Sequence, residues 1–218
     1  MKEFFKKYNH SLFALYLFLY LPWFVYLEKT VTTDFYVIHS PLDDLIPFCE
    51  YFIIPYYIWF GYVAAACVYF FFKSKDEFIK MASFLCIGMS ICLLICTIFP
   101  NGLALRPQTF ARDNIFVKLV KGLYITDTPT NVCPSIHVYN SIGVHIAVSR
   151  AKSFENKRYI KIISLIICIL ICMSTMFLKQ HSIIDVCAAC ILAFIMYHLT
   201  FCPFFYKNRQ KVSEQIAE

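Results

Sequence analysis

Two residues with side chains suited to nucleophilic catalysis lie in a short polar stretch between two long apolar runs. The stretch covers residues 178–186, and within it His181 and Asp185 are four positions apart. Ser182 is a good N-cap, so a helix that begins there would place both side chains on one face. The carboxylate can then hold one imidazole nitrogen as N–H and leave the other free to attack. His181 is therefore the candidate nucleophile.

A second histidine follows a proline–serine pair that can begin a helix. Residues 133–137 read Cys-Pro-Ser-Ile-His, and Pro134 fits the first helical position because its φ angle is fixed. Free amides and the helix dipole at such a start favour an anion. Ser135 can add a hydroxyl donor, and the helix start at Ser182 points further amides toward the same place. His137 would lie close to this anion site.

Arg106, beside Pro107, completes the set because a guanidinium can clamp a phosphate through two parallel hydrogen bonds. Two histidines, one orienting carboxylate, one arginine and two helix starts suit phosphoryl transfer by covalent catalysis. A simpler interpretation is that His181 and Asp185 form a polar turn that caps a helix. The presence of His137 and Arg106 on the same face favours the catalytic interpretation.

The elements that must position these residues are predicted to be membrane-spanning helices. Apolar residues make up 60% of the chain, the mean hydropathy is +0.62, and long runs carry no charge. We expect a single all-α domain over residues 1–218, a polytopic membrane protein with a bundle of six transmembrane helices. The expected spans are residues 11–27, 51–72, 79–99, 134–149, 160–178 and 183–205.

The basic residues predict the orientation of this bundle. With six spans and the amino terminus inside, fourteen of the twenty Lys and Arg lie on the inner side. Arg106, His137 and His181 then meet on the outer face. The net charge of +6 does not indicate nucleic acid as a partner, because the basic residues form short clusters between apolar runs. We expect an integral protein of the plasma membrane with its site on the extracytoplasmic side.

The chain resembles the type 2 phosphatidic acid phosphatase superfamily, which includes the lipid phosphate phosphatases. That family has three signatures: Lys-x6-Arg-Pro, Pro-Ser-Gly-His and Ser-Arg-x5-His-x3-Asp. This chain shows, in the same order, Arg106-Pro107, then Pro134-Ser135-Ile136-His137, then Ser174-Thr175-x5-His181-x3-Asp185. The resemblance covers nearly the whole chain in topology and about a dozen residues in motif.

The resemblance implies a membrane phosphatase that hydrolyses a lipid phosphate or pyrophosphate monoester. His181 would form a phosphohistidine and Asp185 would orient it, while His137 would protonate the leaving oxygen and then deprotonate the acceptor. Arg106 and Ser135 would hold the phosphoryl oxygens. The family pattern implies no cofactor; the partners would be the lipid phosphate substrate and the membrane lipids.

Three positions depart from the signatures. The first-signature Lys is Phe99, the third-signature Arg is Thr175, and the second-signature Gly is Ile136. Lys179 is a candidate replacement for the missing phosphate-binding cations; Arg112, Lys118 and Lys121 are others.

These departures leave three functions open. The chain also resembles the branch that contains inositol phosphorylceramide and sphingomyelin synthases, which move a phospho-headgroup to a lipid hydroxyl. A transporter or a non-catalytic lipid-binding relative is the third option.

Two histidines and one aspartate can also bind zinc or iron, but no fuller ligand set is visible, so we expect no metal. Cys49 and Cys133 lie near the expected outer loops, where a disulfide is one option.

Overall fold

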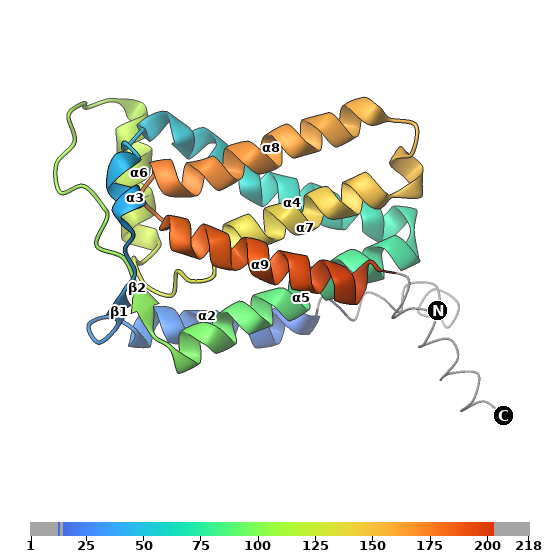
Figure 1. The fold of residues 1–218 in the computed structure, drawn as a ribbon, viewed down its shortest axis with the longest axis horizontal. Coiled ribbons are helices and arrows are strands. Elements are labelled where there is room, and N and C mark those ends of the chain that lie inside the picture. Colours follow the sequence, from blue (N-terminus) through green and yellow to red (C-terminus); the bar gives the residue numbers. More distant parts are fainter. Residues whose placement is uncertain (1–12, 14, 203–218) are drawn as a thin grey trace.

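The computed structural model describes residue 13 and residues 15–202. This part of the chain is mostly helical (Figure 1). The α-helices are α2 (Tyr16–Thr30), α3 (Pro41–Leu45), α4 (Ile53–Lys73), α5 (Lys75–Ile98), α6 (Ile115–Thr126), α7 (Ile136–Arg150), α8 (Arg158–Phe177) and α9 (Ile183–Thr200). The shorter elements are the 3-10 helices η2 (Glu50–Phe52) and η3 (Lys152–Phe154) and the strands β1 (Tyr36–Val37) and β2 (Asn101–Gly102).

Four helices are long and apolar enough to cross a membrane: Glu50–Lys73, Lys75–Ile98, Arg158–Phe177 and Ile183–Thr200. They coincide with the second, third, fifth and sixth expected spans. Helices α2 and α7 coincide with the first and fourth, but each has only 15 residues in the structure. Residues 11, 12 and 14 of the first expected span and residues 203–205 of the sixth lie outside the described residues.

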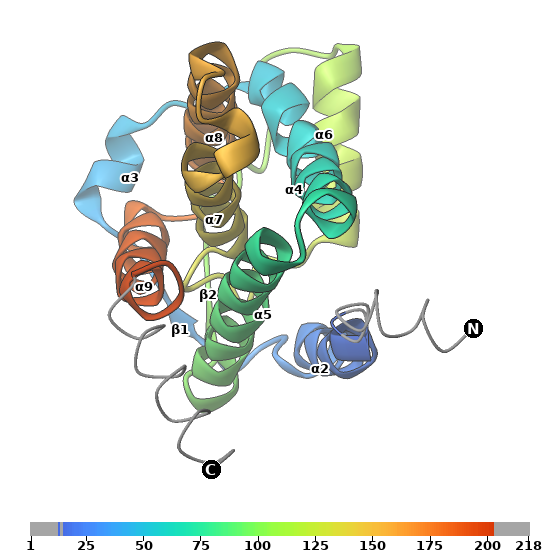
Figure 2. The same ribbon diagram turned by 90° about the vertical axis from the view of Figure 1, so that its right-hand side faces the viewer.

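Helix α7 is the central element of the bundle. It packs against α4, α5, α8 and α9, and Figure 2 shows it between them when the bundle is viewed along its axis. The contact with α5 is close because Gly88 faces the ring of Tyr139, where an added Cβ would lie 1.9 Å from the nearest ring carbon. The hydroxyl of Tyr139 donates to the carbonyl of Phe84 at 2.7 Å. Because α7 is enclosed, its polar side chains Asn140 and Ser141 are buried among other helices.

One end of the bundle carries the elements that the sequence did not predict. Figure 1 shows α3, α6 and the strands at the end where α8 turns into α9, and the α4–α5 and α7–α8 turns at the opposite end. Strand β1 pairs in parallel with β2, with Tyr36 opposite Asn101. The Asn101 side chain accepts from the amides of Val132 and Cys133, at 3.0 and 2.9 Å. This contact holds the segment that leads into α7.

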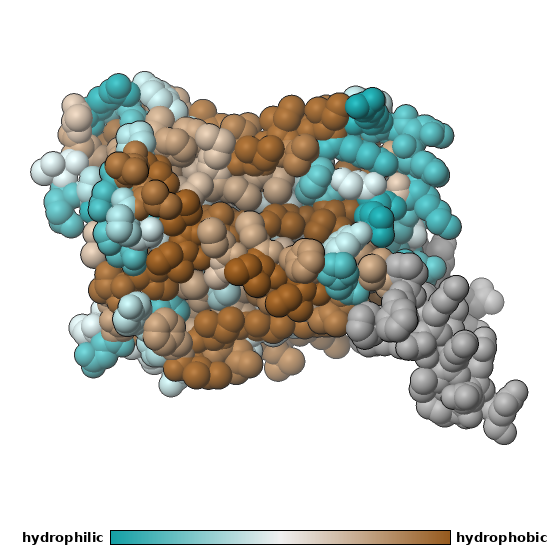
Figure 3. Space-filling view, viewed as in Figure 1, coloured by the Kyte–Doolittle hydropathy of each residue, from teal (hydrophilic) through white to brown (hydrophobic). Residues whose placement is uncertain are grey.

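The surface has an apolar middle and polar ends. In Figure 3 hydrophobic residues cover the sides of the long helices, and hydrophilic residues gather at both ends of the long axis. Exposed apolar side chains on these helices include Phe60, Ile98, Ile166 and Phe194. A belt of this kind is a feature of proteins whose sides face lipid.

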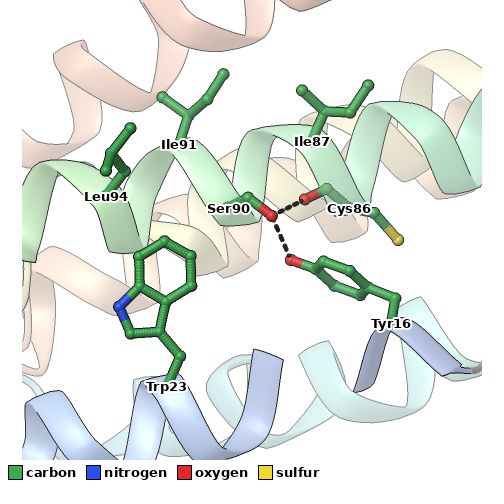
Figure 4. A pocket seen from close by; sticks show the side chains of 7 residues that line it. All are labelled: Tyr16, Trp23, Cys86, Ile87, Ser90, Ile91 and Leu94. Carbon is green, nitrogen blue, oxygen red and sulfur yellow. Dashed lines mark hydrogen bonds between the residues drawn. The ribbon is translucent and has the colours of Figure 1, made fainter. Parts of the chain in front are cut away.

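A shallow groove of about 370 Å³ lies between α2 and α5 (Figure 4). Ile87, Ile91 and Leu94 contribute apolar side chains to it. Its polar atoms are paired, since the Tyr16 hydroxyl is 3.0 Å from Ser90 Oγ and Ser90 Oγ donates to the carbonyl of Cys86. None of the candidate catalytic residues lines this groove.

Candidate active site

The α8–α9 turn places His181 and Asp185 as the sequence predicts. Helix α9 begins after the N-cap Ser182, and Asp185 closes a capping box with it. The Nδ1–H of His181 donates to Asp185 Oδ2 at 3.3 Å, and the amide of Ser182 donates to the same oxygen at 2.8 Å. Asp185 therefore both caps the helix and orients the imidazole. With Nδ1 protonated, the lone pair of His181 is on Nε2.

Helix α7 begins two residues later than the sequence predicts: Ile136, not Pro134, is the first helical residue. Ser135 is the N-cap, and its Oγ accepts from the amide of Val138. The Ser135 side chain is fully buried, and as an acceptor in the cap it keeps its hydroxyl proton for another partner. The amides of Ile136 and His137 have no intrahelical acceptor in this first turn. The α7 start thus keeps donors for an anion.

The two imidazole rings lie together although they are 44 residues apart in sequence. The ring centroids of His137 and His181 are 5.9 Å apart, with a 58° angle between the ring planes. Tyr56 and Trp59, one turn apart on α4, contact the His137 ring with centroid distances of 4.6 and 4.3 Å. These aromatic rings fix the plane of His137. The two imidazoles are close enough for one phosphoester group to contact both.

Arg106 joins the site through the residue next to His181. Its Nη2 donates to Gln180 Oε1 at 2.6 Å, and its Nη1 donates to the carbonyl of Tyr124 at 3.1 Å. The guanidinium carbon lies 4.5 Å from the centroid of the Tyr124 ring. Tyr124 in turn donates to the carbonyl of Leu178 at 2.7 Å. The guanidinium is thereby tied to the turn that carries His181.

Three buried N–H donors in this region have no partner among the described residues: Arg106 Nε, Gln180 Nε2 and Trp59 Nε1. Buried donors in proteins are almost always hydrogen-bonded, so a group of unpaired ones calls for a ligand or ordered water. Each belongs to a residue that contacts the histidine site or a neighbour of it. Oxyanion oxygens and water oxygens can both accept from N–H donors of this kind.

A half-buried carboxylate that the sequence analysis did not single out also faces the site. Asp127 Oδ2 accepts from the hydroxyl of Tyr56 at 3.1 Å. Burial raises the pKa of the Asp127 carboxyl above its ordinary value of 3.8; the nearby charges of His181 and Arg106 and the bond from Tyr56 act in the opposite direction. The ionised form of Asp127 is therefore disfavoured in the folded chain, although it lies near the positive charge of Arg106.

Lys179 and the start of α9 are engaged by α3. The Lys179 ammonium donates to the carbonyl oxygens of Asp43 and Ile46. The amide of Ile183 donates to Asp43 Oδ1 at 2.8 Å. The expectation that the α9 start points its amides at a substrate is therefore corrected: a carboxylate from α3 already occupies that anion position, because Asp43 reaches across the turn.

The positions that depart from the family signatures have local roles in this structure. Phe99 packs against Tyr36 with ring centroids 5.2 Å apart. Thr175 is fully buried, and its carbonyl accepts from the amides of Gln180 and His181. Arg112 pairs with Glu50 at 3.1 Å. Among these cations in the described residues, Arg106 is thus the one that hydrogen-bonds to a residue adjacent to a site histidine.

Cys49 and Cys133 form no disulfide in the described part of the chain. Cys49 and Cys133 are both free thiols, and burial together with the Asp185 carboxylate raises the pKa of Cys133 to about 12. No group of three or more His, Cys, Asp or Glu among residues 13 and 15–202 is arranged to hold a metal ion.

Sequence reasoning missed four residues of the site: Tyr56, Trp59, Asp127 and Gln180. Gln180 could have been noticed because it precedes His181 directly. Tyr56 and Trp59 are spaced by three residues on a predicted span, which places them on one helix face. Asp127 carries no motif, and its role is visible only when α6 is folded against α4.

Comparison of the chain with protein-family models, with curated proteins and with solved structures finds no match.

Proposed function

We propose that this chain is an integral membrane phosphoric ester hydrolase of the phosphatidic acid phosphatase type. In this proposal α2, α4, α5, α7, α8 and α9 form six membrane spans, with the short α7 enclosed by the others. The site faces the extracytoplasmic side of the plasma membrane, where α3 and α6 lie. The substrate is a lipid phosphate or pyrophosphate monoester.

The observation that carries the proposal is the contact between the two imidazoles, 5.9 Å between centroids, with Asp185 on Nδ1 of His181. Nε2 of His181 attacks phosphorus, the bond to the leaving oxygen breaks, and protonated His137 gives that oxygen a proton. His137 then takes a proton from water, which attacks the phosphohistidine and releases inorganic phosphate. Arg106 and Gln180 supply donors for the oxyanion as charge develops.

Turnover by single-histidine variants tests these roles. In detergent, the wild-type chain is expected to release phosphate from at least one of phosphatidic acid, phosphatidylglycerol phosphate, a polyprenyl pyrophosphate and a sphingoid phosphate. His181→Ala should abolish both release and the acid-labile phosphoenzyme, and His137→Ala should lower the rate by about 10²–10⁴-fold.

His145→Ala is the matched control. It removes a histidine from the same helix two turns away, where the ring contacts Ser164 and Ser149, so its turnover should stay near wild type. Full activity in His181→Ala would refute the assignment. Absence of phosphate release from every lipid, with no phosphoenzyme, would leave a non-catalytic lipid-binding or transport role in its place.

A second candidate is transfer of a phospho-headgroup to a lipid hydroxyl, and the charge of the site favours it. A phosphomonoester dianion needs more positive charge than a phosphodiester monoanion. Here the charge of Arg106 is opposed by the half-buried carboxyl of Asp127, and Lys179 and Arg112 bind other groups of the chain. The same screen with a phosphodiester lipid, with and without diacylglycerol or ceramide, distinguishes the two: transfer requires the acceptor, whereas hydrolysis does not.

A further inference from the structure

The turn that carries His181 is held from outside by a segment more than 130 residues earlier in the chain. Lys179 in this turn has a φ of 56°, a left-handed conformation that a residue with a side chain adopts only when its surroundings enforce it. The turn's own bonds run from the amides of Gln180 and His181 to Thr175. These two hydrogen bonds attach the turn to α8. Other contacts must fix the position of the turn relative to α7 and α9.

Asp43 of α3 supplies two of those contacts with its carboxylate; Arg106 and Tyr124 supply others through Gln180 and Leu178. Oδ2 accepts from the hydroxyl of Ser182 at 2.7 Å, and Oδ1 accepts from the amide of Ile183 at 2.8 Å. Oδ2 also accepts from the amide of Ser40, so the carboxylate is fixed within its own capping box. Asp43 is 2% exposed and Ser182 is fully buried, which makes these hydrogen bonds strong.

Lys179 holds the same segment from the other side of His181. Its ammonium donates to the carbonyl of Asp43 at 2.7 Å and to the carbonyl of Ile46. Residues 179, 182 and 183 are thus all attached to α3, and His181 lies between them. Because the amide of Ser182 is the second donor to Asp185 Oδ2, a shift of Ser182 would also move the carboxylate that orients the imidazole.

We propose that Asp43 is a positioning residue for the nucleophile: through Ser182 and Ile183 it fixes the geometry in which Asp185 holds the Nδ1–H tautomer of His181. The inference rests on the proposed function, in which His181 attacks phosphorus through Nε2. Asp43 touches neither substrate nor imidazole in this arrangement. It acts through the turn.

Asp43→Asn is the test, because it keeps the size of the side chain and removes the charge and one acceptor. Asp44→Asn is the matched control: Asp44 is the next residue of α3, is exposed, and has the His39 ring as its side-chain hydrogen-bond partner, with no hydrogen bond to the His181 turn among the described residues. The readout is the ¹⁵N spectrum of the His181 imidazole in histidine-labelled protein, assigned through its loss in His181→Ala. Kinetic constants are measured on the same samples.

Wild type and Asp44→Asn are expected to show one His181 tautomer with the proton on Nδ1, whereas Asp43→Asn should show a mixture. In Asp43→Asn we expect kcat to fall at least tenfold while KM changes less than twofold, since the phosphate contacts of Arg106 are retained. A single unchanged tautomer and unchanged kcat in folded Asp43→Asn would overturn the proposal.

A second variant and a substrate-free spectrum test the role of Asp43 independently of Asp43→Asn folding and of turnover. Ser182→Ala removes the hydroxyl that donates to Asp43 and should reproduce the tautomer mixture; it replaces Asp43→Asn if that variant does not elute as a folded species. The spectrum needs no substrate. If the wild-type chain turns over no lipid, the proposed function fails, while the comparison of Asp43→Asn with Asp44→Asn still decides whether Asp43 positions His181.

Discussion

At the scale of single residues, the candidate site contains three buried N–H groups without a hydrogen-bond acceptor in the described part of the chain. Arg106 Nε, Gln180 Nε2 and Trp59 Nε1 are buried and unpaired among the described residues. Leaving a buried donor unpaired costs about 1–3 kcal/mol. Such a cost can persist where the unpaired groups serve a ligand, and these atoms belong to residues at or next to the histidine pair.

Asp127 gives a prediction about pH. Burial holds the pKa of its carboxyl above 3.8 in the folded chain, so protonation favours the folded state. The stabilisation is complete below the unfolded pKa and is lost as pH rises through the higher folded pKa. Asp127→Asn, whose amide oxygen can still accept from Tyr56, should therefore raise the Tm at pH 7, and the gain should shrink as the pH is lowered toward 4.

Thermal unfolding in detergent across this pH range measures the effect. Asp113→Asn is the control, because Asp113 is exposed in the same connection and its replacement should leave the Tm unchanged at every pH. A lower Tm for Asp127→Asn at pH 7 would show that the carboxylate is stabilising and contradict the prediction.

The sequence indicated His137, His181, Asp185 and Arg106 because their types and spacing carry chemistry. It could not indicate Asp127, whose importance depends on the residues that lie across the fold from it. Lys179 shows the same limit: a lysine two residues from a histidine suggests phosphate binding, yet its ammonium contacts carbonyl oxygens of α3. Side-chain direction at a positive φ angle is not readable from residue type.

At the scale of elements, the position of His137 depends on how closely α7 approaches α5. The Tyr139 ring lies against Gly88 and stacks on Phe84 with centroids 4.7 Å apart. Small residues permit this approach between apolar helices. Any side chain at position 88 must push α7 away from α5, and the His137 end of α7 moves with it.

Gly88→Ala should therefore lower the Tm and the turnover together. The added Cβ would lie 1.9 Å from a carbon of the Tyr139 ring, and Tyr139 is fully buried and cannot move freely. Gly61→Ala is the matched control, since no atom lies within 4 Å of its added Cβ; its Tm and activity should equal those of wild type or exceed them slightly. Thermal unfolding and phosphate release measure both, and an unchanged Tm in Gly88→Ala would contradict the packing.

The six long apolar runs could be predicted as helices because hydropathy and length suffice for that purpose. Helix α6 was missed because Lys118 and Lys121 interrupt its apolar residues. Its buried positions Val117, Val120 and Leu123 do recur every three residues after the N-cap Asn114, which was the available signal. The two-residue strands and α3 are too short to leave a periodic pattern.

At the scale of the whole molecule, the membrane orientation that we propose can be tested at the two polar ends of the bundle. Lys118 and Lys121 are exposed on α6, and Lys152 and Lys157 are exposed at the α7–α8 turn. In intact cells, a membrane-impermeant amine reagent should modify the first pair and reach the second pair only after permeabilisation. Peptide mapping by mass spectrometry measures this, and the reverse pattern would place the site on the inner side.

The shortness of α7 sets the depth at which the histidines work. Its 15 residues amount to about 22 Å, whereas the 24 residues of α5 amount to about 36 Å, and Figure 1 shows α7 stopping before the end reached by α8. In the bilayer orientation that we propose, the His137 end of α7 would therefore lie deeper than the ends of the helices around it, and the phosphate of a lipid substrate would have to reach that depth to contact His137.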